Sequence, residues 1–215
     1  MKKHEKLSLI RDTGVVAIIR AQRADQLLAA AEAIAAGGVR AIEVTMTTPD
    51  ALQVIEAAAR QAGSDVLIGV GTVLDAETAR LAILAGAGFV VSPTLNLGVI
   101  ALCNRYGIPV LPGCYTPTEM MTAWEAGADM IKFFPADVGG PRLVSGLLAP
   151  LPQLELVPVG GVTLENAAEF ICHGAAAVGV GGSLVNQALL DAGDMAGLTR
   201  RAAAFIAAVK QGRAT

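Results

Sequence analysis

A single lysine stands in the middle of an apolar stretch, "ADMIKFFPAD", at residues 128–137. This residue, Lys132, is the only lysine between Lys6 and Lys210. Burial favours the neutral form of an amine and lowers its pKa, and a neutral lysine amine can attack a ketone carbonyl to form a Schiff base. The stretch alone leaves an alternative open, in which the stem is buried and the ammonium reaches the surface.

Two further charged residues occur in apolar, strand-like stretches. Glu43 lies inside "AIEVTM", and Arg20 ends "VVAIIR". A carboxylate beside a Schiff base can transfer protons during the reaction, and a guanidinium can hold a substrate carboxylate through paired hydrogen bonds. The alternative for the three charges is a salt-bridge cluster that fills a core.

Short apolar runs alternate with helical, alanine-rich stretches along the chain. The predicted strands span residues 15–20, 41–46, 66–71, 88–92, 108–113, 130–135, 154–160 and 176–182. Continuous apolar runs bounded by Gly or Pro are typical of parallel strands, and eight strand–helix units in series predict a closed (β/α)₈ barrel. We therefore expect an α/β protein with one domain, residues 1–215, in which a short amphipathic helix precedes the first strand.

In such a barrel the active site lies at the carboxyl ends of the strands. The period of two along a strand places Glu43 and Thr45 on one side, and Lys132 and Phe134 on one side. Glycine pairs follow the seventh and eighth strands, where barrels commonly bind phosphate at the start of a helix. The alternative is that these glycines only permit tight turns.

Composition excludes several classes of function. The chain has 215 residues, is 53% hydrophobic and carries a formal net charge of −3, so nothing indicates nucleic-acid binding. No apolar run approaches the roughly 18 residues of a membrane span, and the N-terminal stretch lacks the apolar segment of a secretory signal. The odd cysteine count predicts free thiols in a reducing cytoplasm. The two histidines lie far apart in sequence, which argues against a histidine-based catalytic metal site, and we also expect no cofactor.

Seven stretches, in order from residue 37 to residue 185, resemble one family. They are "GGVRAIEVTMTTPDA", "IGVGTVLDAE", "VSPTLN", "IPVLPGCYTPTE", "IKFFPADVGGP", "VPVGGVTLEN" and "AVGVGGSLV". The family is that of the 2-keto-3-deoxy-6-phosphogluconate (KDPG) aldolases, also described as 4-hydroxy-2-oxoglutarate (KHG) aldolases. The resemblance implies a metal-free class I aldolase, usually a homotrimer, that cleaves the phosphorylated keto acid to pyruvate and glyceraldehyde 3-phosphate, as in the Entner–Doudoroff pathway.

The resemblance also implies a role for individual residues. The lysine of "KFFP" forms the Schiff base, here Lys132, and the glutamate of "EVT" is the general acid/base, here Glu43. The threonine of "GTV" helps to hold the pyruvate carboxylate, here Thr72. The pocket-lining and phosphate-binding positions correspond to Pro93, Phe134, Gly160, Gly161, Gly182 and Ser183.

Two positions depart from the family's gluconate enzymes. Many members carry an arginine that grips the carboxylate where this chain has Thr47, and Arg20 matches the version in which an arginine ends the first strand. Val159 stands where gluconate enzymes often have threonine, as in the 2-keto-3-deoxy-6-phosphogalactonate aldolases. The preferred epimer, and whether the substrate is phosphorylated, therefore stay open.

Two other functions fit the same residues. A sugar-phosphate isomerase or epimerase would use Glu43 as a base and Lys132 as a fixed charge, and fold alone does not exclude it. A non-catalytic phosphate-binding protein would give no reason for a lysine and a glutamate on apolar strands.

Overall fold

The computed structural model describes residues 1–20 and 24–215. In this part of the chain, helices and strands alternate almost throughout. The strands are β1 (Val15–Ile19), β2 (Ala41–Thr45), β3 (Leu67–Gly71), β4 (Val90–Val91), β5 (Val110–Leu111), β6 (Gly113–Cys114), β7 (Ile131–Phe133), β8 (Leu156–Pro158) and β9 (Val178–Val180). Each predicted strand stretch contains at least one of them.

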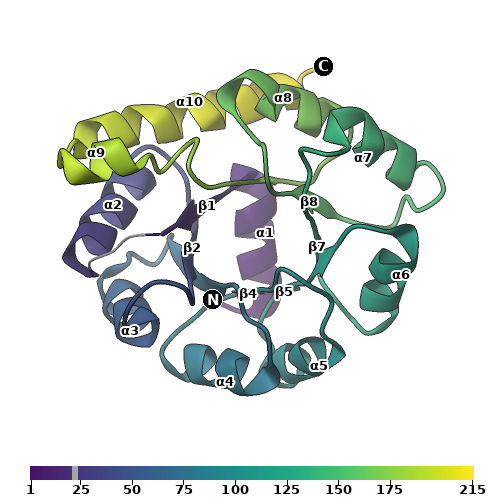
Figure 1. Cartoon of the computed structure of the whole chain (residues 1–215), viewed down its shortest axis with the longest axis horizontal. Coiled ribbons are helices and arrows are strands. Elements are labelled where there is room, and N and C mark those ends of the chain that lie inside the picture. The colour runs from purple at the N-terminus through teal and green to yellow at the C-terminus, as the bar shows by residue number, and fades with distance from the viewer. Residues whose placement is uncertain (21–23) are drawn as a thin grey trace.

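The helices follow the strands around the molecule. They are α1 (Lys3–Thr13), α2 (Ala24–Ala36), α3 (Ala51–Gln61), α4 (Ala76–Leu84), α5 (Leu97–Tyr106), α6 (Pro117–Glu125), α7 (Gly140–Leu148), α8 (Leu164–Cys172), α9 (Gln187–Asp191) and α10 (Met195–Arg213). Figure 1 shows the strands gathered around the centre, the later helices around the outside, and α1 behind the strands. The predicted N-terminal helix is confirmed as α1.

All strand pairs are parallel, and they form two sheets. The larger sheet is curled and has the order β5-β4-β3-β2-β1-β9, and the smaller has the order β6-β7-β8. An isolated parallel bridge between Val159 and Gly179 joins the segment after β8 to β9. The coarse prediction, an α/β fold with a parallel sheet, is therefore confirmed.

The predicted fifth strand is interrupted at Pro112, which separates β5 from β6. Proline has no backbone N–H and cannot donate to a neighbouring strand. Its carbonyl still accepts a hydrogen bond from the Lys132 amide at 3.0 Å. The segment from β5 to β6 thus lies beside β4 at its start and beside β7 at its end.

The buried apolar residues form two clusters, one on each face of the strands. The larger cluster lies between the strands and the surrounding helices. The smaller cluster lines the interior, and α1 contributes Leu7 and Ile10 to it. Its other members are Val16, Ile18, Ala41, Leu67, Phe89, Val91, Leu111, Met130, Val157, Val159 and Ala177. The helix α1 therefore covers the amino-terminal end of the interior between the two sheets.

Within the described residues, no helix is both long and apolar enough to cross a lipid bilayer.

Candidate active site

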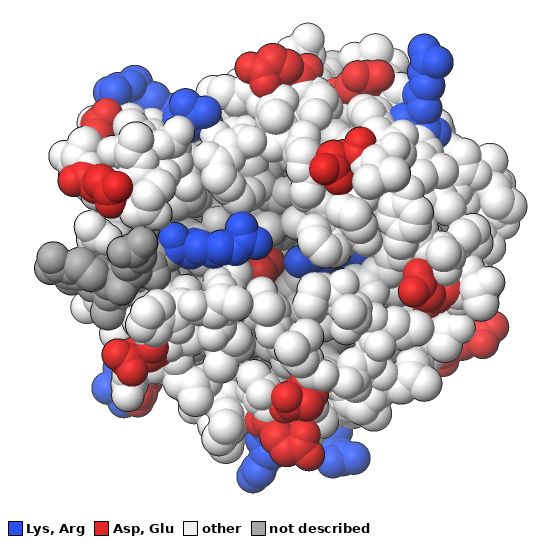
Figure 2. Space-filling model, viewed as in Figure 1, with Lys and Arg blue, Asp and Glu red and all other residues white. Residues whose placement is uncertain are grey.

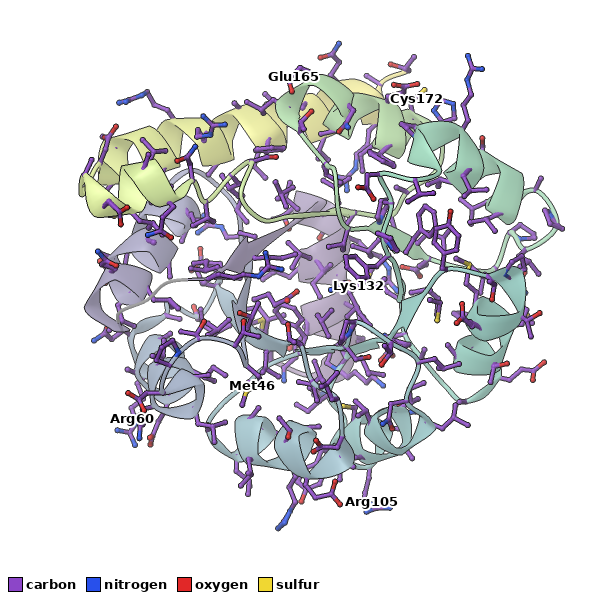
Figure 3. All side chains as sticks on the ribbon, viewed as in Figure 1. Met46, Arg60, Arg105, Lys132, Glu165 and Cys172 are labelled. Atoms are coloured by element: carbon purple, nitrogen blue, oxygen red, sulfur yellow. The ribbon has the colours of Figure 1, made fainter. Side chains whose placement is uncertain are left out.

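Glu43 and Lys132 both point into the ring of strands. Two residues before them, Ala41 and Met130 belong to the interior cluster, and alternate residues of a strand share a face. Only 2% of Glu43 and 6% of Lys132 is exposed. Figure 3 shows Lys132 near the centre of the ring, whereas Arg60 and Arg105 lie at its outer edge. The structure is therefore at odds with a lysine that extends its ammonium into bulk water.

Burial shifts the pKa of both groups toward the neutral form. The pKa of Lys132 is lowered, first by burial and then by Arg20, while Glu43 opposes the shift. The pKa of Glu43 is raised by burial, against the opposing effects of Lys132 and Arg20. Each effect is the one expected when a charge loses water or gains a charged neighbour. Burial therefore raises the fraction of Lys132 amine that is neutral and nucleophilic, and the fraction of Glu43 that carries a proton.

The lysine and the glutamate influence each other without direct contact. Among the described residues, none of the ion pairs within 4.0 Å joins Lys132 to Glu43. The ammonium nitrogen instead lies 5.0 Å from the centre of the Phe134 ring. The two groups therefore act on each other through their charges and not through an ion pair.

A cavity of about 250 Å³ lies at the ends of β1, β7, β8 and β9, and Phe134 lines it, whereas Lys132 and Glu43 do not. Of the residues predicted for the site, it is lined by Arg20, Phe134, Val159, Gly160, Gly161, Gly182 and Ser183. Figure 2 shows the same face of the molecule, where an acidic group lies in a central hollow between two basic ones. The structure thus brings together the predicted phosphate-binding residues and one arginine.

Two glycines of this cavity cannot be replaced freely. Gly160 and Gly161 have φ values of 93° and 70°, a region that other residues rarely adopt. A Cβ on Gly161 would also lie 2.5 Å from the Cβ of Asp137. Because Gly160 and Gly161 have no side chains, their backbone N–H groups can approach an anion closely.

Three predicted residues lie at the ends of β2, β3 and β4 and do not line this cavity. Thr47 is exposed, and its hydroxyl lies 2.9 Å from that of Thr45. Thr72 has a φ of 59°, which is strained for a β-branched residue and is found mainly at functional positions. Pro93 is partly buried against Gly113, whose Cβ, if present, would overlap its carbonyl.

Sequence reasoning did not assign a role to Gly71, the last residue of β3. A Cβ at this position would overlap the Glu43 carboxyl group and lie 2.7 Å from its Cγ. The sequence offers one signal for this role. Glycines alternate in "GVG", so one face of β3 carries no side chain at these two positions.

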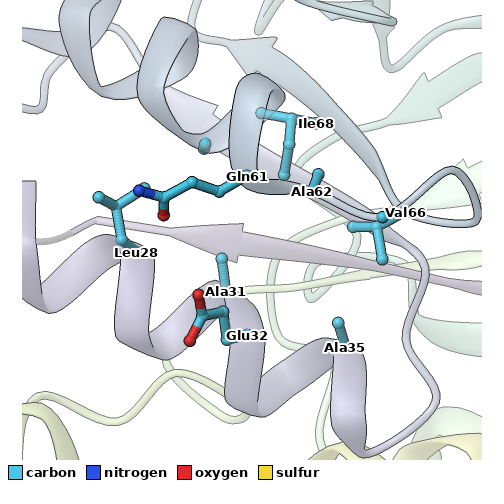
Figure 4. A pocket seen from close by; sticks show the side chains of 10 residues that line it. Leu28, Ala31, Glu32, Ala35, Gln61, Ala62, Val66 and Ile68 are labelled. Atoms are coloured by element: carbon cyan, nitrogen blue, oxygen red, sulfur yellow. The ribbon is translucent and has the colours of Figure 1, made fainter.

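A second cavity, of about 80 Å³, lies between α2 and α3 on the outer side of the sheet. Figure 4 shows its lining, in which Glu32 and Gln61 are the only polar side chains labelled. Its lining contains no Ser, Thr, Cys, Lys or His side chain. Among the described residues, no group of three or more His, Cys, Asp or Glu side chains is placed to hold a metal ion.

Comparison with known proteins assigns the chain to a family. The model of the KDPG and KHG aldolase family matches residues 7–201. The chain belongs to this family. As a family member it is an aldolase, and aldolases are lyases.

Curated relatives of this aldolase carry two different substrate names. The chain is 40% identical over 186 residues to the 2-dehydro-3-deoxy-phosphogluconate aldolase of Treponema pallidum, covering 86% of this chain and 88% of that one. It is 37% identical over 199 residues to the 2-dehydro-3-deoxy-6-phosphogalactonate aldolase of Escherichia coli, covering 92% and 95%.

One solved structure of a related aldolase contains a covalent adduct of pyruvate. The KDPG aldolase of Legionella pneumophila, with pyruvate captured as a covalent carbinolamine, matches this fold with a TM-score of 0.85 and 29% identity, covering 92% of this chain and 96% of that one. A carbinolamine is the adduct of an amine and a carbonyl.

Proposed function

We propose that this aldolase cleaves KDPG to pyruvate and glyceraldehyde 3-phosphate by Schiff-base chemistry on Lys132. The observation that carries the proposal is a lysine with a lowered pKa, buried in the interior beside a buried glutamate. A sugar-phosphate isomerase would have no need for a neutral amine.

In the proposed reaction, the neutral amine of Lys132 adds to the C2 carbonyl of the keto acid. Glu43 donates a proton to the carbinolamine hydroxyl, which leaves as water and gives an iminium ion that acts as an electron sink. Glu43 takes the proton of the C4 hydroxyl, the C3–C4 bond breaks, and its electron pair moves toward the iminium to form an enamine. Glyceraldehyde 3-phosphate leaves as the aldehyde. Glu43 then returns the proton to C3, and water releases pyruvate and the free amine.

The substrate spans two parts of the site in this proposal. Arg20 and Thr72 hold the carboxylate, and Phe134 and Pro93 cover the reacting carbons. The phosphate binds at the four rim residues Gly160, Gly161, Gly182 and Ser183, where the cavity and the backbone conformation favour an anion. Thr47 contributes its hydroxyl beside Thr45.

The residues of the site are also compatible with two other substrates of the same reaction type. Val159 lines the cavity, and its side chain cannot donate the hydrogen bond that threonine could give to a substrate hydroxyl. This position favours 2-keto-3-deoxy-6-phosphogalactonate as the alternative epimer, in line with the name of the Escherichia coli relative. The short keto acid 4-hydroxy-2-oxoglutarate, which yields pyruvate and glyoxylate, needs no phosphate site.

We also propose an assembly. The eight strand positions form one closed (β/α)₈ barrel and one domain, and three copies form a homotrimer in the cytoplasm. Exposed leucines at Leu74, Leu81, Leu84 and Leu97, on and beside α4 and α5, supply an apolar surface for such a contact. Light scattering measures the mass of the assembly, and a monomer at micromolar concentration would contradict a trimer.

Borohydride reduction in the presence of pyruvate tests the chemistry. We expect one stable adduct, located on Lys132 by mass spectrometry, and neither adduct nor cleavage in the Lys132→Arg variant, because a guanidinium cannot be deprotonated. The matched control is Lys210→Arg, a change at an exposed residue of α10, and this variant should behave as the wild type. Adduct on another residue, or turnover in Lys132→Arg, would refute the mechanism. Cleavage rates for the two epimers and for 4-hydroxy-2-oxoglutarate then assign the substrate.

A further inference from the structure

Strand β3 presents almost no side chain to the interior. Its inward positions are Leu67, Gly69 and Gly71, of which only Leu67 reaches the interior cluster. The space above the two glycines is filled from neighbouring strands. The Phe89 ring occupies the place of a Cβ on Gly69, and the Glu43 carboxyl group occupies the place of a Cβ on Gly71.

The position of the Glu43 carboxyl does not follow from strand pairing alone. The Cα of Glu43 pairs with Gly69, and that of Thr45 pairs with Gly71. The carboxyl group nevertheless lies over Gly71, so the side chain leans two residues toward the carboxyl end of the sheet. This is the end at which Arg20 and the rim cavity lie.

We propose that Gly71 is a positioning residue: its missing side chain forms the recess that holds the Glu43 carboxyl group at the height of the reacting carbons. The proposal rests on the function proposed above. Any side chain at this position would push the general acid/base away from the enamine, although it would not touch the substrate itself.

The backbone conformation at Gly71 does not itself require a glycine. Gly71 is absent from the described residues with positive φ, unlike Gly160, so alanine can adopt its conformation. The atoms that alanine would displace belong to the flexible end of the Glu43 side chain. The fold can therefore accept Gly71→Ala by moving the carboxyl group, whereas a Cβ at Gly69 would meet the ring of Phe89.

The first measurement separates amine chemistry from proton transfer. With Gly71→Ala we expect the full extent of pyruvate trapping on Lys132, but exchange of the pyruvate methyl protons with D₂O slowed about 100-fold, the scale for a displaced catalytic group. We also expect kcat for KDPG to fall while KM stays within about threefold. The control is Gly146→Ala on α7, where a Cβ has open space. Exchange at the wild-type rate in Gly71→Ala would refute the proposal.

A double-mutant cycle shows whether the effect acts through Glu43. In the Glu43→Ala background the recess is empty, so adding Gly71→Ala should cause no further loss of exchange and no loss of thermal stability. An equal loss in both backgrounds would show a structural role and overturn the proposal.

Crystal structures of the wild type and of Gly71→Ala give a readout that needs no substrate. We expect the carboxyl group to leave the recess in the variant while the strands keep their positions. An unmoved carboxyl group would overturn the proposal. If the wild type instead fails to trap pyruvate, the proposed function is wrong, and the two structures still decide whether Gly71 positions Glu43.

Discussion

The ammonium nitrogen of Lys132 lies over the ring of Phe134, 5.0 Å from its centre, on the same side of the strand. A cation over an aromatic face is stabilised, whereas burial of the same nitrogen favours the neutral amine. Phe134 is itself 37% exposed. The ring therefore lies between the amine and the solvent and contacts the group whose charge must change during the reaction.

The first prediction concerns the pKa of the lysine amine. Burial lowers the pKa of Lys132 from 10.5, so acylation of its amine should reach half its maximal rate below pH 10.5. Glu43 opposes this shift, and Glu43→Gln removes its charge, so the midpoint should move to still lower pH. Mass spectrometry after acylation at a series of pH values measures it. Glu125→Gln, at an exposed site, is the control; a midpoint that rises in Glu43→Gln would contradict the assigned coupling.

The second prediction concerns Arg20. Losing a charge-assisted hydrogen bond to a carboxylate costs about 1.5–3 kcal/mol, so Arg20→Gln should raise the KM for pyruvate-dependent trapping about ten- to hundredfold. Pyruvate has no phosphate, so this measurement isolates the carboxylate. Arg60→Gln on the outer face is the control (Figure 3). An unchanged KM for pyruvate, with a raised KM for KDPG alone, would assign Arg20 to the phosphate instead.

The third prediction concerns the rim at Gly182. A Cβ here meets no protein atom within 4 Å, so Gly182→Ala should leave the melting temperature unchanged. The added methyl group points to a place where the phosphate is proposed to bind. We expect KM for KDPG to rise at least about tenfold, the equivalent of one charge-assisted hydrogen bond, with cleavage of 4-hydroxy-2-oxoglutarate unchanged. Equal losses for both substrates would place the phosphate elsewhere.

The fourth prediction concerns the epimer. Val159→Thr adds a hydroxyl to the cavity at nearly constant volume, and a neutral hydrogen bond contributes about 0.5–1.5 kcal/mol. The ratio of kcat/KM for the gluconate epimer to that for the galactonate epimer should therefore rise about two- to tenfold. Val138→Thr, on an exposed residue, should leave the ratio as it is. A fall in the ratio would mean that the hydroxyl faces the other epimer.

Local sequence patterns predicted the order of the elements and the burial of two charged side chains. Apolar runs bounded by Gly or Pro located eight of the nine strands. Alternation placed Glu43 on one side of its strand with Thr45, and Lys132 on one side with Phe134; the structure shows that this side is the inner one for both charged residues. The apolar pattern of residues 108–113 predicts one strand, but the strand is broken at Pro112 because proline has no backbone N–H.

Features that depend on packing between strands could not be read from the sequence. The recess at Gly71 exists because Glu43, from another strand, leans over it, and register between strands has no local signature. The left-handed backbone of Thr72 is likewise unexpected, because a β-branched residue rarely adopts it. Whether the cavity at the rim holds a phosphate stays a prediction.

The helix α1 has a consequence for the order of events during turnover. Leu7 and Ile10 fill the amino-terminal end of the interior, whereas the glycine-lined cavity lies at the opposite end, where we expect substrate to enter and products to leave. After the proposed cleavage pyruvate is still joined to Lys132 as the enamine, whereas the aldehyde is held by no covalent bond. We expect the aldehyde to depart before pyruvate, which product-inhibition patterns would reveal as ordered release.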